Sequence, residues 1–206
     1  MCLALFVAAA GARWATRRAS NELARQLGIT PPAAEAVKIP SFALTERTGR
    51  TVTDQELRGR VWVAGFVFTR CPSVCPRLAG EMAALQPRLA ALPGGEDARL
   101  VAFSVDPEYD TPPVLTAWAR GLGADPERWL FLTGDRLQIW RLAEQGFKLP
   151  VSSVMGEAPH PILHSQKLVV VDRYGEVRGW FDPLDEPAHV EALLLQVEQA
   201  LAEPKR

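Results

Sequence analysis

The chain has 206 residues, 48% of them hydrophobic, which is enough for a sizeable core in one domain of about 150 residues with a terminal extension. Its 23 basic residues balance 24 acidic ones without a long run of one sign, which argues against nucleic acid as the main partner. Three cysteines are too few for a disulfide scaffold, so a cysteine pair here indicates a site rather than a structural staple.

The N-terminus carries a ten-residue apolar run, from Leu3 to Ala12. It is shorter than the roughly 20 residues that cross a bilayer. A signal peptide would have a basic residue before its apolar run, and here none precedes Leu3. Cys2 lies before the run and not after it, so Cys2 does not match a lipidation site. Two interpretations stay open: a membrane anchor that begins upstream, which we favour, or a short hydrophobic tail packed on the domain. We predict a hydrophobic segment and linker over residues 1–37 and one domain over residues 38–206.

The first half of the domain predicts a hairpin, a central strand and a helix. The strand is almost wholly apolar, as expected when both of its faces are covered. The helix that follows has apolar residues at a 3.6-residue period and stops at a Pro-Gly-Gly sequence. The predicted bounds are Ser41 to Thr45 and Arg50 to Thr53 for the hairpin, Asp54 to Leu57 for a turn, Val61 to Phe68 for the strand, and Pro76 to about Leu92 for the helix.

The second half predicts further strands that alternate with helices and then a closing hairpin and helix. Residues 152–161 have the Gly, Pro and Ser content of a loop. This order predicts an α/β domain with a central sheet between layers of helices. The predicted elements are a strand Arg99 to Val105, a loop Asp106 to Pro113, a helix Val114 to Leu122, a strand Trp129 to Leu132, a helix Asp135 to Gln145, a short extension Phe147 to Val151, a hairpin of Leu168 to Asp172 with Val177 to Phe181, and a helix from about Glu186.

Cys71 and Cys75 lie between the central strand and the first long helix, in the sequence Phe68-Thr69-Arg70-Cys71-Pro72-Ser73-Val74-Cys75-Pro76. The N-terminus of a helix favours thiolate, which is both the nucleophile of disulfide chemistry and a ligand for soft metals. In a regular helix, residues four apart have Cα atoms about 6 Å apart, which suits a disulfide and also lets both sulfurs reach one ion. The pair therefore predicts a redox dithiol, a soft-metal site, or both, in preference to two buried small hydrophobes.

The three histidines differ in their expected roles. His189 lies beside the apolar stripe of the last helix, which indicates a surface or boundary residue. His164 lies at the junction between a loop and the strand that begins near Lys167, where a rigid sheet can hold a functional side chain. His160, four residues earlier, is a second candidate.

Four segments together resemble the Sco/SenC copper-chaperone family. The resemblance covers residues 38–202 approximately, and it is specific because four motifs coincide in order and spacing. The first motif is the cysteine sequence from Phe68 to Pro76. The other three are the acidic loop Phe103-Ser104-Val105-Asp106-Pro107-Glu108-Tyr109-Asp110-Thr111-Pro112, the turn Leu132-Thr133-Gly134, and the histidine strand and hairpin from His164-Ser165 through Val171-Asp172 and Gly175 to Arg178-Gly179.

This resemblance implies a thioredoxin-like fold, with a central mixed sheet flanked by helices and an N-terminal extension. It also implies one copper ion per chain, held by Cys71, Cys75 and His164, because two thiolates suit cuprous copper and an imidazole completes a trigonal site. The implied partners are cytochrome c oxidase subunit II and a copper donor protein. The implied location is the periplasmic face of the bacterial inner membrane, with the N-terminal segment as a membrane attachment.

Two charged residues near the motif carry their own expectations. Arg70, directly before the first cysteine, should lower the pKa of both thiols and slightly oppose a bound cation. Asp106 would either orient or gate the site, or would simply cap the turn before Pro107.

The same cysteines support a second function, a thiol-disulfide reductase. Cys71 would then be the attacking thiol and Cys75 the resolving thiol of a redox-active disulfide. Peroxide reduction is a third interpretation, and it would leave the histidine strand without a role. The three residues between the cysteines favour the metal site over both.

Overall fold

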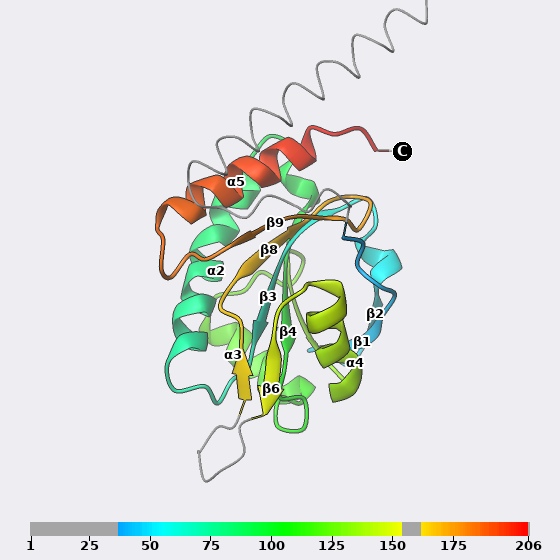
Figure 1. Cartoon of the computed structure of the whole chain (residues 1–206), viewed down its shortest axis with the longest axis vertical. Helices are drawn as coiled ribbons and strands as arrows, with labels where there is room; N and C mark the ends of the chain where they lie inside the picture. The colour runs from blue at the N-terminus through cyan, green and yellow to red at the C-terminus, as the bar shows by residue number, and fades with distance from the viewer. Residues whose placement is uncertain (1–36, 154–161, 206) are drawn as a thin grey trace, which may run out of the picture.

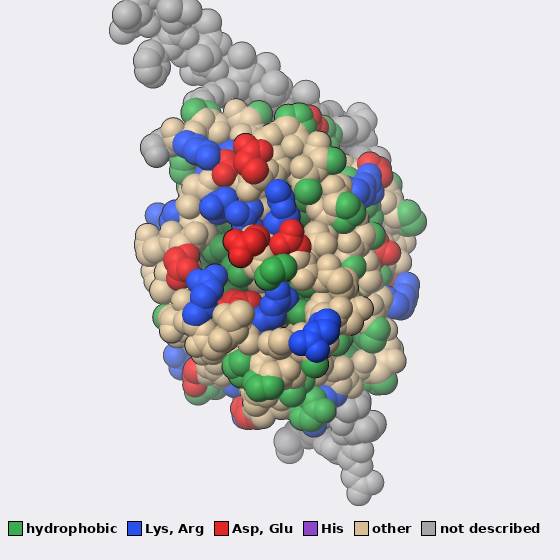
Figure 2. Space-filling model, turned by 180° about the vertical axis from the view of Figure 1, so that it is seen from behind, with side chains coloured by type: hydrophobic (Ala, Val, Ile, Leu, Met, Phe, Trp, Pro, Cys, Tyr) green, Lys and Arg blue, Asp and Glu red, His purple; other side chains and the backbone are tan. Residues whose placement is uncertain are grey.

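The computed structural model describes residues 37–153 and 162–205 (Figure 1). The predicted N-terminal anchor, the predicted loop from residue 154 on, and His160 lie outside the described residues. Within the described ranges, no helix combines the length and the apolar character needed to cross a membrane. Charged side chains of both signs are interspersed on the face shown in Figure 2, as the balanced composition suggests.

A seven-stranded mixed sheet forms the centre of the domain, in the order β2-β1-β5-β4-β3-β8-β9. β3, β4 and β5 are parallel, whereas β1 pairs with β5, and β8 with β3, in the antiparallel sense. The prediction of a central mixed sheet is confirmed. The strands are β1 (Ala43–Glu46), β2 (Thr51–Thr53), β3 (Val61–Val67), β4 (Ala98–Ser104), β5 (Trp129–Thr133), β8 (Leu168–Val171) and β9 (Val177–Phe181).

Helices cover both faces of this sheet (Figure 1). They begin where the sequence favours it: Pro112 is the first residue of α3, and the Asp135 side chain accepts a hydrogen bond from Gln138 N at the start of α4. The helices are α2 (Val74–Ala91), α3 (Pro112–Gly121), α4 (Arg136–Arg141) and α5 (Ala188–Leu201), with a π-helical turn η3 (Leu142–Gly146) after α4 and 3₁₀ turns η1 (Asp54–Leu57) and η2 (Gly95–Asp97).

Strand β3 shows why its sequence is apolar at every position. All seven of its residues are buried. Gly65 faces α2, where a Cβ atom would lie 2.9 Å from Met82 Sδ. Its neighbour Phe66 faces the other way and packs against Phe147, at 5.2 Å between ring centroids. Because the two faces are covered by different helical segments, the strand ends in a fixed position just before Phe68 and the cysteine loop.

Two predictions about local structure are wrong. The predicted loop does not begin at residue 152. Residues 152 and 153 belong to β6 (Val151–Ser153), which pairs antiparallel with β7 (Ile162–His164) in a separate two-stranded sheet. His189, predicted to be a surface or boundary residue, is buried: it is 8% exposed, and its Nδ1 accepts a hydrogen bond from Asp182 N at 2.9 Å. The strands β6 and β7 were not predicted because three residues carry too little periodicity to be recognised in a sequence.

Candidate metal centre

Cys71 and Cys75 occupy different positions at the start of α2. The helix begins at Val74, earlier than predicted, so that Cys75 lies in its first turn and Cys71 in the loop before it. Cys75 is fully buried, whereas Cys71 is partly exposed. Both thiols are free. The pair is therefore not a regular helical i,i+4 pair, but the Cys75 backbone N–H still donates to Cys71 Sγ at 3.4 Å.

This difference separates the two thiol pKa values. Partial burial works against ionisation of Cys71, but the backbone N–H groups of Cys75, Ser73 and Val74 outweigh it and lower the pKa of Cys71. Burial strongly raises the pKa of Cys75, and the neighbouring Cys71 raises it further. The prediction that the helix N-terminus favours thiolate is confirmed for Cys71 and wrong for Cys75.

His164 reaches the cysteines from the end of β7, not from a loop. Val151 on β6 is its partner in the strand pair. The His164 Nε2 atom lies 3.0 Å from Cys75 Sγ, and the ring meets Phe68 edge-on at 5.5 Å between centroids. His164 Nδ1 lies 2.9 Å from Ser165 O, so Nδ1 carries the proton and donates, and the Nε2 lone pair faces the sulfur. Burial lowers the pKa of His164, which keeps the ring neutral.

The three side chains could hold one metal ion. Their ligand atoms all lie within 4.8 Å of one another. Two ligands that each lie about 2.3 Å from one ion are at most about 4.6 Å apart, so small movements would bring all three to bonding distance. Two sulfurs and a neutral imidazole nitrogen form a soft donor set that suits copper or zinc better than magnesium or calcium. The hydrogen bond from Nδ1 to a backbone carbonyl is the usual way to orient a metal-binding histidine.

Arg70 does not act on the thiols as predicted, because its charge is paired elsewhere. Its Nη2 lies 2.7 Å from Asp106 Oδ2, and its guanidinium stacks over the Tyr109 ring at 4.5 Å. The expected lowering of the Cys75 pKa is wrong. Asp106, which was a candidate for orienting the site, anchors Arg70 from the acidic loop and is not among the three grouped ligands.

Asp110 is the residue that the sequence analysis missed. It is fully buried and accepts hydrogen bonds from Thr69 N at 3.1 Å, from Thr69 Oγ1 and from Ser104 Oγ. Burial raises the pKa of Asp110 although these bonds oppose the change. The carboxyl group thus fixes the residue two positions before Cys71. The acidic loop was recognised, but nothing in the sequence distinguishes its buried carboxylates, Asp106 and Asp110, from the exposed Glu108.

Replacing Asp110 should destabilise the cysteine loop and with it the domain. Asp110→Ala leaves the buried Ser104 hydroxyl and the partly buried Thr69 N–H without their acceptor, which costs about 1–3 kcal/mol of unfolding free energy. Glu108→Ala in the same loop is the matched control, since that side chain is mostly exposed and should change stability by less than about 0.5 kcal/mol. Urea unfolding of both variants measures the difference. Equal stability of the two variants would refute this role for Asp110.

The pKa difference between the cysteines predicts an order of chemical modification. Thiolate reacts with iodoacetamide, and the pKa of Cys71 is lowered while that of Cys75 is raised, so reduced Cys71 should be alkylated at a lower pH than Cys75. Peptide mass mapping across a pH series separates the two sites, and Cys2 in the same sample gives a third cysteine for comparison. Faster labelling of Cys75 than of Cys71 would contradict the asymmetry.

Comparison with known proteins identifies relatives with the same architecture. A model of the SCO1/SenC family matches residues 30–198. The SCO1 protein homolog of Bacillus subtilis is 33% identical over 141 residues, which is 68% of this chain and 71% of that protein. The residues matched by the family model include all three residues of the candidate metal centre.

Two solved structures agree with the fold. BsSco, described as a member of the Sco family of cytochrome c oxidase assembly proteins with a disulfide switch, superposes with a TM-score of 0.72 at 29% identity, covering 85% of this chain and 99% of that one. Bradyrhizobium japonicum ScoI with copper bound gives a TM-score of 0.63 at 25% identity, covering 77% and 98%. The expected thioredoxin-like fold of the Sco proteins is confirmed.

Proposed function

The chain belongs to the SCO1/SenC family, and from that premise we propose that it is a copper metallochaperone that binds one copper ion through Cys71, Cys75 and His164. The observation that carries the proposal is the convergence of two sulfurs and an unprotonated imidazole nitrogen within 4.8 Å. Copper-bound ScoI of Bradyrhizobium japonicum supports the choice of metal.

The two cysteines would contribute differently to binding. Cys71 is the partly exposed thiol, and its lowered pKa favours thiolate, so it makes the first contact with an arriving ion. Cys75 is buried and protonated in the free protein, and it must lose its proton before it can coordinate. Copper binding therefore releases a proton from Cys75 to solvent, and His164 Nε2, 3.0 Å from that sulfur, keeps its lone pair free to coordinate the ion.

Release follows from the same chemistry. When a disulfide forms between Cys71 and Cys75, each sulfur gives up one electron to an oxidant, and both thiolate ligands are lost together. Neither the imidazole nor the backbone then holds a soft ion tightly. The redox state of the pair would thus set whether copper is kept or delivered.

We propose cytochrome c oxidase subunit II, with its binuclear copper centre, as the protein that receives the copper. The description of BsSco as belonging to a family of oxidase assembly proteins supports a partner of this kind. A separate donor protein would load the chain. We further propose that residues 1–37 hold the domain, residues 38–206, at the periplasmic face of the inner membrane.

The test is copper transfer between purified proteins. Reduced, copper-loaded chain is mixed anaerobically with the metal-free soluble domain of subunit II, the two are separated, and copper is measured in each. Delivery would be supported if copper moves from the chain into subunit II. The control is a small copper-loaded chelator at the same free copper concentration, from which no copper should move into subunit II. Retention of all copper on the chain would refute it.

A thiol-disulfide reductase is the second candidate, and the asymmetry of the cysteines favours it. An exposed thiol of lowered pKa suits nucleophilic attack, and a buried neighbouring thiol suits resolution of the mixed disulfide. Turnover of the subunit II disulfide by the copper-free reduced chain would support this activity. The two functions are compatible, because each uses the reduced pair.

A further inference from the structure

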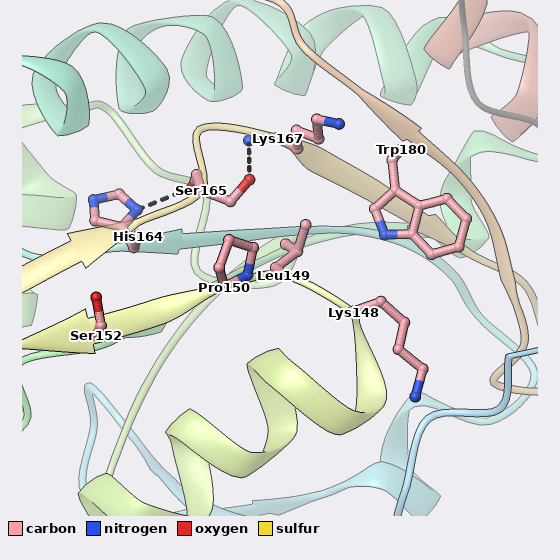
Figure 3. Close-up of a pocket in the computed structure, with 8 residues that line it drawn as sticks. All are labelled: Lys148, Leu149, Pro150, Ser152, His164, Ser165, Lys167 and Trp180. Atoms are coloured by element: carbon pink, nitrogen blue, oxygen red, sulfur yellow. Dashed lines mark hydrogen bonds between the residues drawn. The ribbon is translucent and has the colours of Figure 1, made fainter.

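A pocket of about 590 Å³ lies beside the candidate metal centre (Figure 3). His164 and Ser165 form one end of it and Trp180, on β9, forms the other. Its volume falls within the range of about 300–1,000 Å³ in which proteins bind ligands. Since a metal ligand forms part of its wall, whatever enters the pocket comes next to the metal centre.

The floor of the pocket is apolar. Leu149 and Pro150 lie in the middle of it (Figure 3). The Trp180 indole donates its Nε1–H to Phe147 O at 2.7 Å, so its polar atom is satisfied within the domain and the ring presents an apolar wall. These side chains are suited to an apolar or aromatic side chain from outside.

Two lysines supply all the charge of the pocket lining. Lys148 and Lys167 are both among its eight lining residues, and no acidic side chain is. In the part of the chain that the structure describes, neither ammonium group forms an ion pair. The lining therefore carries two positive charges and no negative one, with the Lys148 and Lys167 side chains pointing to opposite sides of its apolar middle (Figure 3). The chain as a whole has a net charge of -1.

Lys148 has a backbone conformation that glycine usually adopts. Lys148 has φ of 55°, the one positive φ outside glycine in the described residues. The left-handed conformation is strained for a side chain with a Cβ atom, and glycine would fit there without that cost. Hydrogen bonds from Phe147 N to Leu142 O and from Leu149 N to Ala143 O hold this conformation. Lys148 directly follows Phe147, the residue that caps the end of η3, where a left-handed residue commonly ends a helix, and glycine is the usual residue there.

We propose that this pocket docks the copper-accepting protein through an apolar side chain flanked by carboxylates. The apolar side chain would lie against Leu149, Pro150 and Trp180, and the carboxylates would pair with Lys148 and Lys167. This rests on the proposed function, and it adds where the acceptor binds and which chemistry it presents. Docking there brings the acceptor's own ligands alongside His164, the ligand at the pocket end.

The experiment is an NMR titration of the ¹⁵N-labelled, reduced, copper-free full chain with the metal-free soluble domain of subunit II. We expect shifts at the amides of Leu149, Ser152, Lys167 and Trp180. The double variant K148E/K167E should bind at least about tenfold more weakly, because each rim pair changes from attraction to repulsion. K38E has the same charge change per residue at an exposed lysine outside the pocket, and should bind as the parent does. Added salt should weaken the parent more than the double variant.

Lys148→Gly separates docking from folding. The substitution relieves the strained backbone, so the melting temperature should stay the same or rise. Binding of the subunit II domain should nevertheless weaken severalfold, because one of the two positive charges is gone. A lysine with only a structural role would give unchanged affinity.

The docking proposal would be overturned by shifts confined to another surface, by charge variants that bind as the parent does, or by no binding of the parent at low salt. Shifts that appear on concentrating the chain alone would instead identify a second copy as the occupant, and would also overturn it. Copper affinity of every variant is measured before the partner is added. A parent chain that retains no copper refutes the metallochaperone function, whatever the docking result.

Discussion

Replacing Cys75 with serine is expected to abolish tight copper binding while leaving the fold intact. The serine hydroxyl is close in size to the thiol and can still accept the hydrogen bond from Phe68 N, but it is a poor ligand for a soft ion. We expect the affinity for cuprous copper to fall at least about a hundredfold. Replacing a residue that only hydrogen-bonds to a metal ligand typically costs about 10- to 100-fold in affinity, and loss of the ligand itself should cost more. Anaerobic competition with a cuprous chelator measures it.

Cys2→Ser is the matched control for this substitution. It removes the chain's remaining cysteine, which lies outside the proposed ligand set, and should leave the affinity unchanged. Cys71→Ser should behave as Cys75→Ser does, because either change leaves one sulfur. Parent-like affinity in both single variants would remove the cysteine pair from the site.

Replacing His164 with alanine is expected to weaken copper binding without removing the redox chemistry of the cysteines. The two sulfurs alone still suit the cuprous ion, so its affinity should fall by about tenfold, and the cupric ion, which needs the imidazole more, should lose more. The variant should still form a disulfide between Cys71 and Cys75. Competition titrations in both oxidation states, with a thiol count before and after oxidation, measure these effects.

His160→Ala is the control here, and it also tests the second histidine candidate from the sequence. The described residues place His164, with its Nε2 facing Cys75, in the position of a third ligand. His160→Ala should therefore bind copper as the parent does. Loss of copper in His160→Ala, together with unchanged binding in His164→Ala, would exchange the roles of the two residues.

The sequence predicted the parts of the fold that depend on long local patterns. The apolar run of β3 and the periodic stripe of α2 are long enough to be recognised, and the cysteines fall at the junction between them. The three-residue strands β6 and β7 were missed, because only their mutual pairing gives them a structure. For the same reason His164 was predicted at a junction between a loop and the next strand, whereas it is the last residue of β7.

The electrostatics of the site could not be predicted from spacing. Whether a thiol has a raised or lowered pKa depends on its burial, and Cys75 is buried beneath His164, which lies 89 residues away in the chain. For the same reason Arg70 was expected to act on the thiols, when Asp106 from the next loop pairs with it instead. Asp110 was missed because it is buried against Thr69 and Ser104, and these residues come together only where β3 and β4 end side by side in the folded sheet.

The most direct test of the metallochaperone function is an anaerobic copper titration of the reduced full chain, followed by absorption spectra and by metal analysis after gel filtration. We predict one tightly held copper per chain, with a thiolate-to-copper charge-transfer band in the cupric form that disappears in the Cys71 and Cys75 variants. Failure to retain copper against a modest competitor, with both thiols shown to be reduced, would contradict it.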